Sequence, residues 1–95
     1  MANCFILQDD EGTYYRYAMN NPQKIDGTLY TGYYTASCYY VVHTEDGDYE
    51  VYNNAGAKIG TFASDPYYVT SYDGNYIVRV YDVDNGEYRF YMLSE

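Results

Sequence analysis

The sequence has no tryptophan and few aliphatic residues, which limits the core that it can form. Its 95 residues include four isoleucines, three leucines and seven valines, against seventeen tyrosines. A tyrosine offers a large apolar ring with a polar tip, so it can close the edge of a core while its hydroxyl stays in water. A chain of this length fits a single domain, residues 1–95, with one modest core. We therefore expect much aromatic surface at or near solvent.

Long hydrophobic runs are also missing. No run approaches the ~18 apolar residues of a membrane-spanning helix. The N-terminal segment MANCFILQDDEG has neither the basic start nor the long apolar stretch of a signal peptide. These absences predict no membrane partner and no secretion through a signal peptide. We expect an intracellular protein, in the cytoplasm or within an assembled particle.

Basic residues are scarce as well. Five Lys and Arg stand against fourteen Asp and Glu, which gives a formal net charge of −9. Such a chain is repelled by phosphate backbones and by anionic membrane surfaces. The composition therefore predicts a protein partner or self-association, and no direct binding to nucleic acid.

Only two cysteines are present, Cys4 and Cys38, and both fall in expected strands. We interpret them as reduced thiols that pack as small hydrophobic groups. A disulfide would require their Cα atoms to lie within about 7 Å of each other, which the sequence does not establish. A zinc site needs about four N or S ligands, whereas Cys4, Cys38 and His43 are three without metal-ligand spacing. We expect no metal and no cofactor.

No segment shows a helical apolar period over 11 or more residues. Short runs rich in Tyr, Val, Ile and Thr instead alternate with Gly, Asn and Asp turns, which is typical of antiparallel sheets. The expected strands are 3–8, 13–19, 29–35, 38–44, 49–53, 58–63 and 67–72, followed by a hairpin over 76–93. Residues 20–28, with one of the two prolines, are expected to be irregular and to cross between sheets. The prediction is an all-β chain of about nine short antiparallel strands, a hairpin-rich meander forming a small sandwich or barrel.

Two hairpins carry explicit register predictions. Asn85-Gly86 favours a two-residue type I′ turn, which would pair Asp82 with Arg89. The same register would pair Val83 with Tyr88, Tyr81 with Phe90 and Arg79 with Met92 on the other face. A two-residue loop at Asp46-Gly47 would place Val42 opposite Val51, and His43 opposite Glu50. The pattern Gly-x-Tyr-x-x-Tyr follows turns at Gly12, Gly47 and Gly86. Its unequal spacing favours reused turn chemistry over a regular repeat.

No recognisable catalytic motif is present. His43 has no nucleophile in a known pattern, and an ion pair with Glu50 across the hairpin explains it. The stretch from Asp82 to Glu87 partly matches a calcium loop, but Gly86 and Glu87 are misplaced and no bidentate Glu follows. The remaining carboxylates lie in turns, where we expect them to be exposed to water and not activated as catalytic acids or bases. We expect no enzymatic activity.

The tyrosines are the strongest functional signal. Adjacent pairs such as Tyr39-Tyr40 point to opposite faces of their strands, so both faces of a sheet carry rings. Exposed aromatic patches mark binding surfaces, and Tyr is enriched in interfaces. The predicted partner-binding residues combine such rings with acidic turn residues: Tyr14, Tyr33, Tyr39, Tyr52, Tyr68, Tyr81, Tyr88, Asp46, Asp48, Asp84 and Glu87.

Three functions follow from these features. The first is a non-catalytic, acidic, protein-binding or assembly module, for example a small accessory or structural component of a phage or other virion. The second is an acidic inhibitor that imitates nucleic acid, of the anti-restriction or anti-CRISPR type. Its binding would weaken steeply with salt, but the acidic residues are spread over at least six turns instead of one face. The third is a carbohydrate-binding module that stacks sugars on Tyr, weakened by the lack of Trp.

Overall fold

The computed structural model describes residues 5–18, 21–31, 39–53 and 55–94. In these residues the chain forms ten strands and no helix. The strands are β1 (Phe5–Gln8), β2 (Tyr14–Ala18), β3 (Asn21–Lys24), β4 (Thr28–Thr31), β5 (Tyr40–His43), β6 (Tyr49–Tyr52), β7 (Lys58–Phe62), β8 (Tyr67–Tyr72), β9 (Asn75–Asp82) and β10 (Glu87–Ser94).

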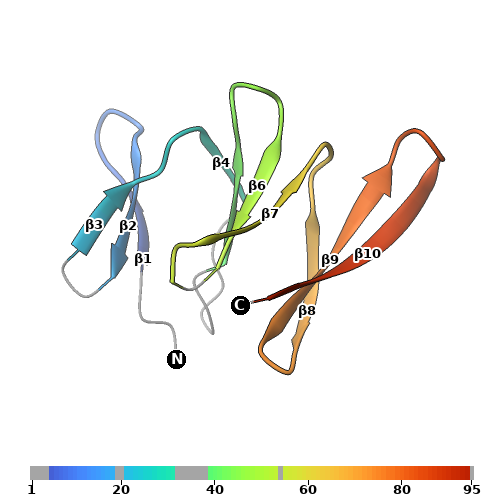
Figure 1. Ribbon diagram of the computed structural model, residues 1–95. Helices are drawn as coiled ribbons and strands as arrows, with labels where there is room; N and C mark the ends of the chain where they lie inside the picture. The colour runs from blue at the N-terminus through green and yellow to red at the C-terminus, as the bar shows by residue number, and fades with distance from the viewer. Residues whose placement is uncertain (1–4, 19–20, 32–38, 54, 95) are drawn as a thin grey trace.

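The strands form sheets in which each strand pairs with its neighbours in sequence. Their orders are β1-β2-β3, β4-β5-β6-β7 and β10-β9-β8, and all pairs are antiparallel. The sheets follow one another across the molecule and do not close into a barrel (Figure 1). The predicted all-β meander is confirmed, with ten strands in the described residues where about nine were expected. None of the described segments is a helix that could cross a membrane.

Strand β5 is buried on both faces because its sheet lies between the other two. Tyr39, Val41 and Val51 pack against the C-terminal sheet, while Tyr40 and Val42 pack toward the N-terminal sheet with Ile25. This explains why β5 and the residue before it read Tyr-Tyr-Val-Val without polar alternation: a strand covered on both sides has no solvent face. The Tyr39-Tyr40 pair does point to opposite faces, as the sequence predicts.

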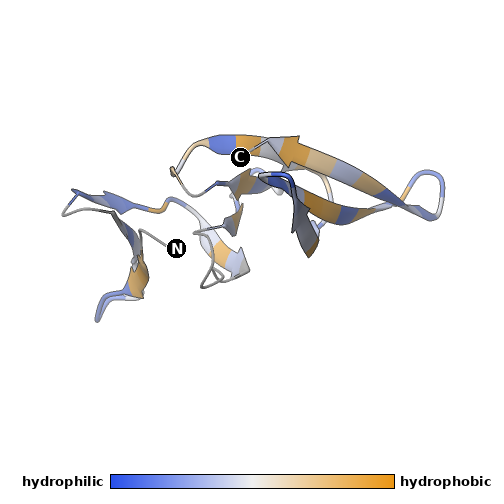
Figure 2. Ribbon diagram, turned by 90° about the horizontal axis from the view of Figure 1, so that it is seen from below, coloured by the Kyte–Doolittle hydropathy of each residue, from blue (hydrophilic) through white to orange (hydrophobic). Residues whose placement is uncertain are grey.

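The C-terminal sheet supplies the other half of the main core. The inward positions of β9 and β10 are occupied by Tyr76, Val78, Val80 and Leu93, all buried. Hydrophobic bands alternate with hydrophilic ones along these long strands (Figure 2). Such alternation leaves the odd-numbered positions of β9 and the even-numbered positions of β10 on the opposite face of the sheet.

The β5–β6 hairpin turns through three residues instead of two. Thr44 N donates to Asp48 O (2.9 Å), Gly47 N donates to Thr44 O (3.0 Å), and Gly47 has a φ of 92°. A left-handed glycine at the end of a three-residue loop is a common hairpin geometry. It moves the register by one residue, so His43 lies opposite Tyr49, and Val42 opposite Glu50. The predicted two-residue loop and the His43–Glu50 pair are therefore wrong.

The same loop closure recurs elsewhere in the chain. Asp9 N donates to Thr13 O (2.9 Å) beside Gly12, and Asn53 N donates to Ala57 O (3.0 Å) beside Gly56. The side chains of Asp9 and Asn53 each accept two backbone N–H bonds within their turns. The shared turn geometry thus accounts for part of the repeated Gly-x-Tyr-x-x-Tyr pattern in the sequence.

The β9–β10 hairpin turns through residues 83–86, because Asp82 pairs with Glu87. Gly86 N donates to Asp82 O (2.8 Å), and within residues 83–86 only Gly86 has positive φ. The predicted type I′ turn at Asn85-Gly86 is therefore wrong, and the register differs by two residues. A shift of two preserves the faces. The predicted type of turn instead occurs between β8 and β9, where Asp73 and Gly74 have φ of 52° and 79°.

The prediction of an irregular 20–28 segment is wrong for residues 21–24. They form the edge strand β3, in which Pro22 lies opposite Tyr17. Proline is tolerated on an edge strand because its missing N–H leaves no ladder bond unmade on the open side. The expectations for Cys4, Cys38 and Tyr33 concern positions outside the described residues.

Candidate functional site

The outer face of the β8–β10 sheet carries an exposed group of large apolar side chains. Pairing places them on one side: Tyr67 is opposite Arg79, Tyr81 is opposite Tyr88, and Phe90 is also opposite Arg79 from the other strand. The large apolar members are between 41% and 65% exposed. We call this surface the aromatic face and define it as Tyr67, Tyr72, Arg79, Tyr81, Tyr88, Phe90 and Met92.

Arg79 lies at the centre of the aromatic face, held between two rings. Its Cζ is 5.0 Å from the centroid of Tyr67 and 4.4 Å from that of Tyr88. Both distances are within the range of cation–π attraction. Its Nε is buried and has no hydrogen-bond partner among the described residues. The two rings therefore hold the guanidinium in place at the centre of this face.

The rest of the aromatic face is also ordered by ring contacts. Tyr81 and Tyr88 meet edge to face with centroids 5.1 Å apart. Asn75 Nδ2 lies 3.6 Å from the sulfur of Met92. Among the described residues of this face there is no carboxylate, although the chain carries fourteen. Tyr, Phe, Met and Arg without Asp or Glu is the composition of a protein interface core.

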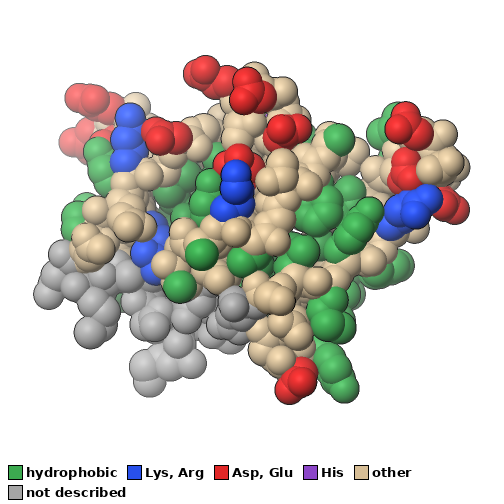
Figure 3. Space-filling view, viewed as in Figure 1, with side chains coloured by type: hydrophobic (Ala, Val, Ile, Leu, Met, Phe, Trp, Pro, Cys, Tyr) green, Lys and Arg blue, Asp and Glu red, His purple; other side chains and the backbone are tan. Residues whose placement is uncertain are grey.

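Carboxylates gather instead at one end of the molecule. In an up-and-down meander alternate turns share an end, and the β1–β2, β5–β6 and β9–β10 hairpins all turn at the top of Figure 1. Acidic side chains lie over these hairpin tips (Figure 3). This acidic end comprises the turn residues and strand ends Asp9, Asp10, Glu11, Glu45, Asp46, Asp48, Asp82, Asp84 and Glu87. The acidic residues are spread over several turns, as expected, but the structure brings three of these turns to one end of the molecule.

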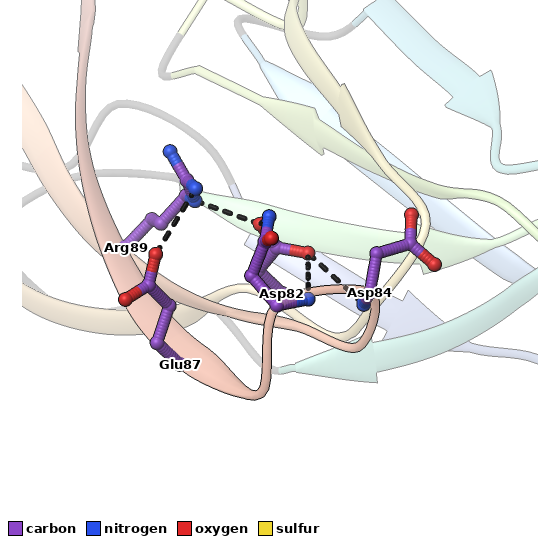
Figure 4. A network of polar contacts seen from close by, with 5 residues as sticks. Asp82, Asp84, Glu87 and Arg89 are labelled. Carbon is purple, nitrogen blue, oxygen red and sulfur yellow. Dashed lines mark hydrogen bonds and ion pairs between the residues drawn. The ribbon is translucent and has the colours of Figure 1, made fainter.

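Asp82, at the acidic end, forms its hydrogen bonds within its own hairpin. Asp82 accepts hydrogen bonds from Asp84 N (3.1 Å), from Asn85 Nδ2 (2.7 Å) and from Arg89 Nε (2.8 Å) (Figure 4). Arg89 also donates to Glu87 at 3.0 Å. The Asn85 amide, and beside it Arg89, hold the pKa of Asp82 below its usual value. The predicted Asp82–Arg89 ion pair therefore forms, although the two residues are not directly opposite.

A cleft of about 1110 Å³ separates the N-terminal sheet from β5 and β6. Tyr40 and Tyr52 stack on its wall with centroids 5.0 Å apart and planes 6° apart. Glu50 accepts a hydrogen bond from the Tyr52 hydroxyl (2.8 Å) and one from Lys58 Nζ (3.2 Å). Burial first, then the Glu50 carboxylate, raises the pKa of Tyr52 above its ordinary value. Both oxygens of Glu50 are thus engaged in structural contacts.

The predicted partner-binding residues separate into groups. Tyr81 and Tyr88 lie on the aromatic face, while Asp46, Asp48, Asp84 and Glu87 lie at the acidic end. Tyr14 and Tyr52 line the cleft between sheets. Tyr68 is half-buried against the core, with its ring 5.1 Å from that of Tyr39. Tyr39 is fully buried, so its assignment to a partner surface is wrong: the C-terminal sheet covers it, with the rings of Tyr68 and Tyr76 against its own.

Sequence reasoning missed most of the aromatic face. Tyr67, Tyr72, Phe90, Met92 and Arg79 were not among the predicted partner-binding residues. A signal for them existed, because the predicted 76–93 hairpin already grouped Arg79, Phe90 and Met92 with Tyr81 and Tyr88. What the sequence did not reveal was which side of this hairpin faces the core.

His43 takes part in a ring cluster instead of an ion pair. Its imidazole stacks on Tyr49 with centroids 4.3 Å apart, and Tyr30 meets both rings edge on. Among the described residues no group of three or more His, Cys, Asp or Glu is arranged to hold a metal ion. Comparisons with protein-family models, with curated proteins and with solved structures give no significant match.

Proposed function

We propose that the chain is a non-catalytic protein-binding module that docks through its aromatic face. The observation that carries this proposal is the exposed, carboxylate-free group of rings around Arg79. Six large apolar side chains exposed to water are unfavourable for a free monomer, because burial of apolar surface lowers the free energy and this surface is not buried. A docking partner would remove that exposure.

The chemistry of the face favours a protein over a small ligand. The face belongs to an open sheet, and Tyr81 is the one member of it that lines either of the two described cavities. Small molecules bind in concave sites, whereas proteins bind broad faces with central aromatic and arginine anchors. Tyr88 and Tyr67 are already fixed by Arg79, so little side-chain entropy is lost when a partner covers them.

Site-specific photocrosslinking tests the proposal. A photoreactive phenylalanine analogue at Tyr72, which is 65% exposed, should give a covalent adduct with a protein in extract of the native host. The matched control places the analogue at Phe5, which is 61% exposed on the outer side of the N-terminal sheet. Adducts from Tyr72 that are absent from Phe5 support the aromatic face. Adducts from Phe5 alone, or from neither position, contradict it.

The acidic end favours a second candidate, the nucleic-acid-mimicking inhibitor. A row of hairpin tips rich in Asp and Glu presents negative charge along one edge (Figure 3). A basic nucleic-acid-binding enzyme would be steered to that edge, with affinity that falls as salt rises. Replacing Asp46 and Asp48 by Asn should then weaken inhibition, while Phe90→Asp should not. The opposite pattern favours the aromatic face.

A further inference from the structure

We propose that the occupant of the aromatic face is a second copy of this chain, packed sheet against sheet. This inference rests on the proposed function and names its partner. It predicts a homodimer whose interface is the outer face of β8, β9 and β10, with Arg79 and its two rings near the centre.

The exposed area matches what a dimer requires. An aromatic or methionine side chain exposed to this degree presents roughly 100–150 Å², so the apolar members of the face together present on the order of 700 Å². The largest apolar patch on a typical monomer is about 300–600 Å². A stable interface buries about 800 Å² per partner. The face is therefore larger than a monomer normally exposes and close to one half of a dimer interface.

The sheet is already built for face-to-face packing. Its inner face packs on the β4–β7 sheet through Val78, Val80 and Leu93. Its outer face presents the same alternating register of large side chains on the same long strands. Two such faces pack with the aligned geometry of a sandwich, about 10 Å apart. A second copy supplies a surface of the same apolar composition.

The distribution of charge also suits self-association. Each copy carries a net charge of −9, which would oppose dimerisation if acids lay in the contact. The aromatic face has no carboxylate among its described residues, and the acidic end stays at hairpin tips in solvent. The repulsion between the acidic ends acts between exposed charges and is screened by salt. The two Arg79 charges that enter the contact are each held between the rings of Tyr67 and Tyr88. Dimerisation should therefore strengthen as salt increases, opposite to the behaviour of a basic partner at the acidic end.

Sedimentation velocity of the full chain tests the inference. We expect a concentration-dependent dimer whose dissociation constant decreases between about 0.1 M and about 0.5 M NaCl. Phe90→Asp, at a side chain 65% exposed on the aromatic face, should abolish the dimer. Phe5→Asp, at a side chain 61% exposed on the N-terminal sheet, should leave it unchanged. Circular dichroism checks that both variants keep their β structure.

Each outcome decides the question. A dimer lost in Phe90→Asp and kept in Phe5→Asp supports the inference. A monomer at all concentrations, or a dimer that persists in Phe90→Asp, overturns it. If Phe90→Asp unfolds, Tyr72→Ser replaces it as the interface variant. A monomer that still forms heterologous photoadducts from Tyr72 overturns the homodimer while the proposed function stands.

Discussion

The guanidinium carbon of Arg79 lies 4.4 Å from the centroid of the Tyr88 ring, across the β9–β10 pair. On the opposite side, Tyr67 from β8 meets the same group at 5.0 Å. One side chain thus links all the strands of the C-terminal sheet on the face that the core does not cover. The contact both stabilises the sheet and orders its exposed rings.

Removing the charge of Arg79 should weaken this sheet. Arg79→Met keeps an apolar stem but loses the attraction to both rings, and we expect a loss of about 1 kcal/mol in the free energy of unfolding. Urea denaturation at low protein concentration measures it for the monomer. Tyr72→Phe, on the same face but outside the Arg79 contacts, should change little. Equal stability of Arg79→Met and the parent chain would contradict the role of the contact.

Gly27 should tolerate no side chain. It has a φ of 101°, and a Cβ there would lie 2.6 Å from Val42 Cγ1 and 2.9 Å from the carbonyl oxygen of His43. Backbone strain and overpacking together should cost about 3 kcal/mol or more in Gly27→Ala. Gly47 has a similar φ of 92° with open space around it, so Gly47→Ala should cost only about 1–2 kcal/mol. Similar melting temperatures for the two variants would contradict this difference.

The Asp82 network should make stability depend on acid pH. Asn85 and Arg89 lower the pKa of Asp82 in the folded state, so its stabilisation is complete above the ordinary Asp pKa of about 4 and is lost as pH falls through the lowered value. Asp82→Asn should therefore reduce the melting temperature at neutral pH, with a difference that shrinks in acid. Asp84→Asn is the control, because that side chain points away from Arg89 (Figure 4). A pH-independent difference would contradict the mechanism.

Tyr52 should affect stability at alkaline pH. Burial and the bond to Glu50 raise its pKa, so the folded state resists ionisation that the unfolded chain undergoes above about pH 10. Stability should fall as pH rises beyond that value, and less steeply in Tyr52→Phe. Chemical denaturation across this pH range measures the slope. Tyr72→Phe, at an exposed ring, should keep the parent profile, and an unchanged slope in Tyr52→Phe would contradict the assignment.

Strand positions could be predicted because Gly, Asn and Asp turns separate runs of Tyr and Val. The register of the strands could not be predicted, because a change of one residue in the length of a loop changes which residues lie opposite each other. At Asp46-Gly47 the glycine closes a three-residue loop, so His43 lies opposite Tyr49 instead of the predicted Glu50. At Asn85-Gly86 the side chain of Asp82 bonds to the loop backbone and favours four residues. Neither competing interaction is visible in the dipeptide.

The aromatic face could be assembled from sequence but not oriented. The alternation of side chains along the strands was enough to group Tyr81, Tyr88 and Phe90 on one face. The predicted register was wrong by two residues, and a shift of two leaves every side chain on the same face. Whether that group or the Tyr76 side enters the core depends on contacts between sheets far apart in sequence. The acidic end was predictable in principle. A meander sends alternate turns to the same end, and those turns contain Asp46 and Asp84.

The consecutive strand order also bears on how the chain reaches its native state. Each ladder joins segments that are adjacent in sequence, as in β8-β9-β10. Only short loops must close before pairing begins, and such local topologies fold faster than β proteins with distant partners. During synthesis each sheet can form as soon as its last strand leaves the ribosome, before the next sheet has been synthesised.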